Sequence, residues 1–149
     1  MGASLGLIAL SLLLATTERA VAVVQAPDSP VRLEKLKILS TDDAPPVLIY
    51  AATNLTDNEL EQFTVTVFVF NREGRLKARQ VAPGRRTLEA RGTKYSAMVL
   101  DVGAIDATDT FMAGVDQAQR AGSEQWWRSD LRTLAEEAAK RSLSLKPVA

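Results

Sequence analysis

The sequence predicts an all-β protein, an antiparallel β-sandwich of about six to seven strands with one helix at its C-terminal end. A long strand-like run, from Phe63 to Phe70, lies between a turn at Asn54 and the four-residue turn at 71–74. Further strand-like segments lie before and after it, roughly 10 to 20 residues apart, with turn residues between them. This spacing favours a sandwich over alternating strands and helices.

The first strand-like segment changes its alternation partway along. Val31 and Leu33 alternate with polar residues, and Leu36 and Ile38 continue on the opposite parity, which predicts a β-bulge near residues 34–35. The other strands are expected at residues 47–53, 62–70, 75–81, 93–100 and 110–115.

The strand at 62–70 is apolar on both faces in its second half, so a further element is expected to cover one face. From Glu124 the period becomes helical, and the sequence predicts an amphipathic helix over residues 123–143, with Ser123 as its N-cap and a tail at 144–149. We expect the side of this helix that carries Trp127 and Leu131 to pack over Phe68 and Phe70. In the alternative, Trp126, Trp127 and Leu131 bind a partner, because adjacent exposed tryptophans are typical of interfaces.

The N-terminus has the pattern of an export signal. An apolar run of 11 residues, Leu5 to Ala15, precedes the small-x-small sequence Ala20-Val21-Ala22, which predicts a signal peptide at 1–22 with cleavage after Ala22. The run is shorter than the roughly 20 residues of a membrane span, so no stable transmembrane span is expected. The first four residues carry no Lys or Arg, and an uncleaved anchor is the alternative. The predicted location is periplasmic or extracellular.

Cleavage at this site would leave 127 residues, enough for one domain, with a lead-in at 23–30 and the sandwich at 31–118. The chain has 18 basic and 18 acidic residues, so its net charge gives no reason to expect nucleic-acid binding. With no cysteine, the fold uses no disulfide.

The composition excludes several chemistries. Because the chain has neither His nor Cys, it has no Ser-His-Asp triad, no thiol nucleophile and no His- or Cys-ligated metal. No pair of carboxylates has a spacing that indicates a glycosidase. We therefore expect no enzyme activity, no catalytic residue and no cofactor.

The run from Tyr50 to Leu76 resembles the core of bacterial FxLYD-type domains. It has an asparagine turn, a long strand and an Asn-x-x-Gly hairpin before a leucine. Residues 88–95 are similar to the segment of those domains that leads into a later strand. Phe70-Asn71 stands where a Tyr-Asp pair is usual. The resemblance covers about a third of the chain and implies an immunoglobulin-like or fibronectin III-like sandwich, exported or membrane-tethered, without a known catalytic site.

A basic stretch is the first candidate site. Strand alternation would place Arg75, Lys77 and Arg79 in one row, with Arg85 and Arg86 following in the next turn. Such a row suits an anionic envelope polymer. Alternatively, these charges protect an exposed strand from edge-to-edge association.

Two further patterns have ready structural explanations. Asp101, Asp106 and Asp109 lie close together, as in some calcium loops, but the spacing matches no EF-hand and aspartates favour turns, so no metal site is predicted. Asn54-Leu55-Thr56 is a formal glycosylation sequon that a turn also explains.

Together these features predict a non-catalytic exported β-sandwich that acts as an interaction or accessory subunit of the cell envelope, bound to an envelope protein through its helix face or a free strand edge. The alternative is a binding module for anionic envelope polymers.

Overall fold

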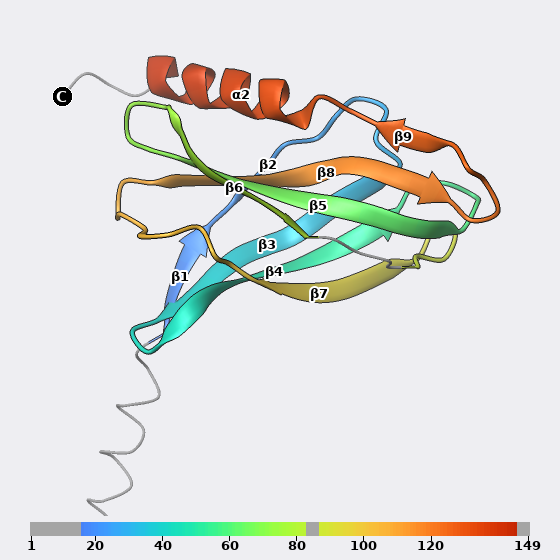
Figure 1. The fold of residues 1–149 in the computed structure, drawn as a ribbon, viewed down its shortest axis with the longest axis horizontal. Helices are drawn as coiled ribbons and strands as arrows, with labels where there is room; N and C mark the ends of the chain where they lie inside the picture. The colour runs from blue at the N-terminus through green and yellow to red at the C-terminus, as the bar shows by residue number, and fades with distance from the viewer. Residues whose placement is uncertain (1–15, 83–86, 146–149) are drawn as a thin grey trace, which may run out of the picture.

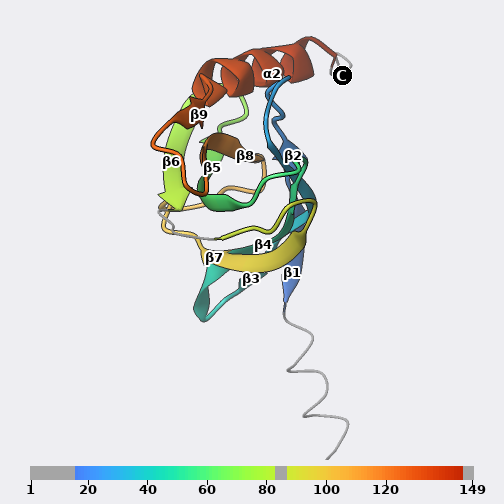
Figure 2. The same cartoon turned by 90° about the vertical axis from the view of Figure 1, so that its right-hand side faces the viewer.

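The computed structural model describes residues 16–82 and 87–145, which form two β-sheets in a sandwich-like arrangement and one helix that lies on the second sheet (Figures 1 and 2). The first sheet has the strand order β1-β3-β4-β7 and the second has the order β2-β8-β5-β6, with β9 also paired to β8. Neighbouring strands are antiparallel apart from the parallel pair β2 and β8. The predicted mainly-β fold with a C-terminal helix is thus confirmed.

The first sheet consists of β1 Thr17–Ala20, β3 Val31–Thr41, β4 Ala44–Asn54 and β7 Thr93–Val99. The predicted bulge in β3 is present, because the register against β4 shifts between Glu34 and Lys37, and Lys35 has a φ of 55°. The bulge returns the apolar residues of both halves of β3 to the same side of the sheet.

The second sheet consists of β2 Ala22–Val23, β8 Thr110–Arg120, β5 Leu60–Phe70, β6 Leu76–Ala82 and β9 Trp126–Arg128. The predicted hairpin joins β5 to β6. Asn71 Oδ1 accepts hydrogen bonds from the backbone N–H groups of Glu73 and Arg75, both at 3.0 Å, and Gly74 has a φ of 77°. A side chain at Gly74 would be strained by this φ, which explains the glycine.

Strand β5 contributes to two apolar clusters. Val65, Val67 and Val69 lie in the larger cluster between the sheets, and Phe68 and Phe70 lie in a smaller one beneath helix α2 (Leu131–Leu145). The helix contributes its buried stripe Leu131, Ala135 and Ala139 to the smaller cluster. The expectation that the helix covers Phe68 and Phe70 is therefore confirmed.

The predicted start of the helix was wrong. Residues 126–128 form strand β9 against β8, and the helix begins at Leu131 and continues to Leu145. Asp130 replaces Ser123 as the N-cap, because its carboxylate accepts hydrogen bonds from Thr133 N at 3.2 Å and Thr133 Oγ1 at 2.7 Å. Trp127 therefore packs against the larger cluster and not over Phe68 and Phe70.

Residues before and after the predicted cleavage site belong to the sheets. Strands β1 and β2 lie on either side of Val21, and the expected polar lead-in contains buried Val24 and Ala26. Residues 1–15 of the predicted signal peptide lie outside the described residues. Within the described ranges, no helix is long and apolar enough to cross a membrane.

Candidate interaction surfaces

The two tryptophans are not the exposed pair that the sequence suggested. Trp126 and Trp127 are each half-buried in β9, and Leu131 is 2% exposed. Arg128 lies over the Trp126 ring, with its Cζ 5.9 Å from the ring centre. Leu131 is therefore part of the core between the helix and the sheet. Trp126 and Trp127 are only partly accessible to a partner.

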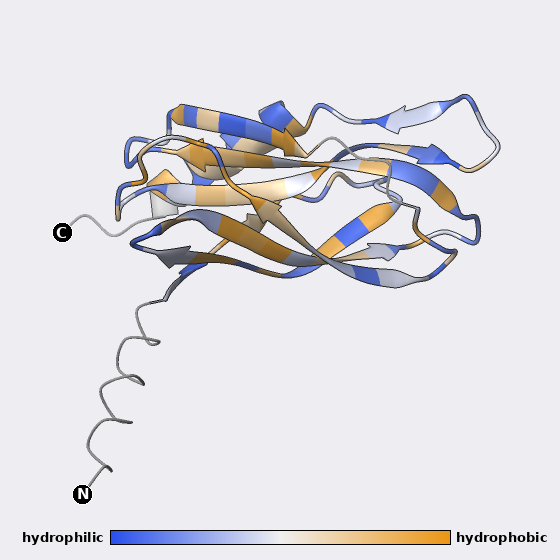
Figure 3. Ribbon diagram, turned by 60° about the horizontal axis from the view of Figure 1, so that its bottom comes forward, coloured by the Kyte–Doolittle hydropathy of each residue, from blue (hydrophilic) through white to orange (hydrophobic). Residues whose placement is uncertain are grey.

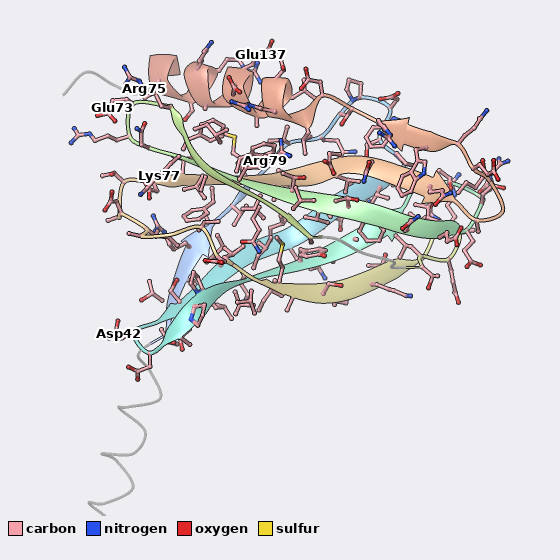
Figure 4. All side chains as sticks on the ribbon, in the orientation of Figure 1. Asp42, Glu73, Arg75, Lys77, Arg79 and Glu137 are labelled. Carbon is pink, nitrogen blue, oxygen red and sulfur yellow. The ribbon has the colours of Figure 1, made fainter. Side chains whose placement is uncertain are left out.

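The expected row of three cations on β6 is interrupted by a register shift. Leu76 packs in the cluster beneath the helix and Ala78 in the cluster between the sheets, because pairing with β5 shifts between these positions. Figure 4 shows Arg75, Lys77 and Arg79 along this strand. The prediction of one uninterrupted row was wrong.

Lys77 is also occupied by acidic side chains. Its Nζ lies 2.7 Å from Asp109 Oδ2 and 3.4 Å from Asp106 Oδ2. Arg75 and Arg79 are exposed, and no carboxylate of the described residues pairs with them. Arg85 and Arg86 lie outside the described residues.

The Asp106 and Asp109 pair stabilises the loop before β8. The Asp109 side chain is 1% exposed, and its Oδ2 accepts a hydrogen bond from Asp106 N at 2.8 Å. Burial opposes its ionisation, but hydrogen bonds from Lys77 and Asp106 N and the charges of Lys77 and Arg19 hold the pKa of Asp109 below its ordinary value. The same Asp109 hydrogen bond raises the pKa of Lys77. This arrangement gives both aspartates a structural role.

The sequon residue Asn54 has a structural role as well. Its side chain is fully buried, and Nδ2 donates to the carbonyls of Asn58, Leu88 and Glu89 at 2.8 to 3.1 Å. Its Oδ1 accepts from Thr56 N and Thr56 Oγ1. Asn54 therefore links two loops, and in the folded chain its amide is inaccessible to a glycan-transferring enzyme.

The outer face of the first sheet carries an apolar surface that the sequence analysis did not single out. We call it the open sheet face, and it consists of side chains in cross-strand register on β3, β4 and β7: Leu39, Val47, Ile49, Tyr95, Ala97 and Val99. Tyr95 is 66% exposed and Val99 60% exposed. Figure 3 brings this side forward and shows its hydrophobic strand segments. Helix α2 covers the opposite side of the molecule, and within residues 16–82 and 87–145 no helix covers this face (Figure 2).

Tyr95 is held in place on this face. Lys35, at the bulge of β3, donates from Nζ to Tyr95 Oη at 3.0 Å and lies 5.5 Å from the centre of the tyrosine ring. Ala51, the register partner of Tyr95 on β4, is 2% exposed. The residue with the left-handed φ in the β3 bulge, Lys35, is thus the one whose side chain contacts the exposed Tyr95 ring.

The open sheet face ends at the free edge of β7. Among the described residues, β4 is the neighbour of β7 in the sheet and no strand pairs with its other edge. At one end, Gln80 of β6 donates to Val99 O at 2.9 Å and accepts from Asp101 N at 2.6 Å. This side chain therefore joins the edges of the two sheets at Val99.

A cavity of about 500 Å³ lies at the end of the sandwich where β1 begins. Its walls come from β1, the β3–β4 turn and the loop before β8, and include Thr17, Arg19, Ser40, Pro46, Ile105 and Ala107. In the described part of the chain, no group of three acidic side chains is arranged to hold a metal ion. No family model, curated protein or solved structure matches this chain.

Proposed function

We propose that this chain is a non-catalytic, exported β-sandwich protein that binds another protein of the cell envelope through the open sheet face and the adjoining edge of β7. The observation that carries the proposal is the contrast between the two outer faces. One is covered by a helix, whereas the other presents Tyr95 and Val99 beside a strand edge with which no described strand pairs. Exposed apolar side chains next to a free edge favour association, and proteins normally protect such edges.

The strand order supports the proposed relation to fibronectin III-like domains. Strands β3, β4 and β7 lie in one sheet and β9, β8, β5 and β6 in the other, with the chain passing between the sheets in the order expected of such a sandwich. One architecture of this kind hosts many unrelated functions, so support for a binding role comes from the surfaces of this chain. The absence of His and Cys, and the use of Lys77 and Asp109 in a structural ion pair, support a non-catalytic role.

The occupant that fits this site is an extended segment of the partner protein. It would pair with the backbone of β7 and place alternate apolar side chains beside Tyr95, Ala97 and Val99, because side chains on one face of a strand recur at every second residue. Lys35 and Lys37 lie on the same face of β3. An acidic residue of the partner segment would therefore find a cation close to the apolar centre.

Position-specific cross-linking in the cell tests this proposal. A photoreactive residue at Ala97 of the C-terminally tagged, full-length chain is expected to capture one defined envelope protein, and Val99→Glu is expected to reduce its yield at least about tenfold, since the variant buries a charge at the contact. Val99→Thr, which preserves shape, is expected to lose less. Both variants should retain the wild-type melting temperature, because the side chain is 60% exposed.

The double variant Arg75→Ser/Arg79→Ser is the matched control on the other sheet. It should leave the cross-link unchanged, because both arginines lie on β6 or its preceding turn, away from the open sheet face. If this variant abolishes retention on anionic envelope polymer and Val99→Glu has no effect on any cross-link, the polymer-binding function is supported and the protein-docking function is refuted.

A further inference from the structure

The segment at Thr17–Val24 crosses from one sheet to the other at the predicted cleavage site. Residues Thr17 to Ala20 pair with β3 from Ser40 to Lys37, and Ala22 and Val23 pair with Met112 and Ala113 of β8. Val24 continues this pairing, with its N–H donating to Ala113 O at 2.9 Å. Figure 1 shows β1 beside β3 and β2 beside β8. The bond after Ala22 therefore lies inside a short strand that contacts the second sheet.

Arg19 holds the first part of this segment against the loop before β8. Its Nη2 donates to three backbone carbonyls, of Asp106 at 2.9 Å, Ala107 at 3.2 Å and Asp109 at 3.2 Å. Its guanidinium also lies over the Phe111 ring, 4.9 Å from the ring centre. Hydrogen bonds from a charged donor are stronger than those between neutral groups, and a cation over an aromatic ring adds to them. Arg19 thus has the contacts of a structural residue.

Cleavage after Ala22 would remove these contacts from the mature protein. It would leave the edge of β3 unpaired from Lys37 to Ser40 and would remove the Arg19 hydrogen bonds to three backbone carbonyls, of which Asp106 O keeps a second donor, Asp109 N. It would also remove Val21, which packs against the larger apolar cluster. A sandwich with this edge uncovered would expose backbone groups that favour association with other chains.

We propose that Thr17–Val24 is a permanent part of the sandwich and that the chain is not cut after Ala22. The small-x-small sequence at residues 20–22 then has a structural explanation, as the place where the chain passes between the sheets. Any cleavage that removes the apolar run from Leu5 to Ala15 would fall before Thr17.

The intact mass of the mature protein is the decisive measurement. The full-length chain, tagged at its C-terminus and purified from its own host, is expected to retain residues 17–22, whether or not residues before Thr17 are removed. A mature N-terminus at Val23 would overturn the proposal. A mature N-terminus at Thr16 or Thr17 would confirm the permanent strand.

A stability measurement tests the role of Arg19 independently of the host. In the purified chain that retains residues 17–22, Arg19→Met is expected to lower the melting temperature by about 10 °C, because it removes several charge-assisted hydrogen bonds but keeps the apolar stem. Glu18→Gln is the matched control. Glu18 is exposed and its contact with Lys37 is a surface pair at 3.5 Å, so a shift of no more than about 2 °C is expected. Equal shifts in the two variants would refute the structural role of Arg19.

Discussion

Gly114→Ala tests whether helix α2 and residue Val24 pack on β8 as described. A Cβ at this position would lie 2.4 Å from Val24 O and 3.0 Å from both Cδ atoms of Leu131. The leucine methyls can rotate away, but the carbonyl belongs to a backbone that is hydrogen-bonded to Ala113. The backbone of Val24 must therefore move by several tenths of an ångström or more.

The expected cost combines two effects. Overpacking in a close-packed region costs about 1 to 3 kcal/mol, and weakening the hydrogen bond from Val24 N to Ala113 O costs about 1 kcal/mol more. We expect a loss of about 3 kcal/mol in the free energy of unfolding, measured by urea denaturation. For a chain of this size this corresponds to a fall of about 10 °C in melting temperature.

A double-mutant cycle with Leu131→Ala separates the two contacts. The second substitution removes the methyl groups at 3.0 Å but leaves Val24 O at 2.4 Å, so Gly114→Ala should still cost most of its full amount in that background. Wild-type stability for Gly114→Ala would refute the packing of Val24 on β8. A cost that disappears in the Leu131→Ala background would show that the clash is with the helix alone.

Three further substitutions test the loops and the helix start. Asn54→Ala should lower the free energy of unfolding by about 3 kcal/mol in urea titrations, because it removes the buried hydrogen bonds that Asn54 donates to three carbonyls and accepts from Thr56. Asp109→Asn should cost about 2 kcal/mol at pH 7 by the same measurement, since the pair with Lys77 loses its charge. Asp130→Ala should lower the melting temperature by about 4 °C at pH 7. The pKa of Asp130 is depressed mainly by the hydrogen bond from Thr133, and that of Asp109 is depressed as well. Each carboxylate therefore stabilises the fold above pH of about 4, and the differences from wild type should shrink as the pH falls below that value. Differences that stay constant down to pH 2 would contradict both assignments.

Local sequence patterns predicted the strands of the sandwich well. The parity change after Leu33 located the bulge at Lys35, because alternation reports directly which side of a sheet a residue faces. The asparagine and glycine of the β5–β6 turn were recognisable for the same local reason. The two apolar faces of β5 also predicted that a helix would cover Phe68 and Phe70.

The helix start and the cation row were missed because distant strands decide them. Trp127 fits the helical period, but residues 126–128 gain more by pairing with β8, about ten residues earlier in the chain. On β6, the register shift against β5 turns Lys77 towards Asp109, a residue 32 positions away. No pattern within either segment contains this information.

The sequence by itself determined the class of fold, most strand positions and the chemistries that this chain lacks, because these depend on residue types and short-range alternation. The tertiary structure decided which surfaces remain uncovered and which charges are already paired. Val47, Ile49 and Val99 read as ordinary strand residues, and only the placement of helix α2 on the opposite sheet leaves them as an open apolar face. Likewise, Arg19 lies in a segment that reads as part of a signal peptide, and its role arises from a loop almost 90 residues further along the chain.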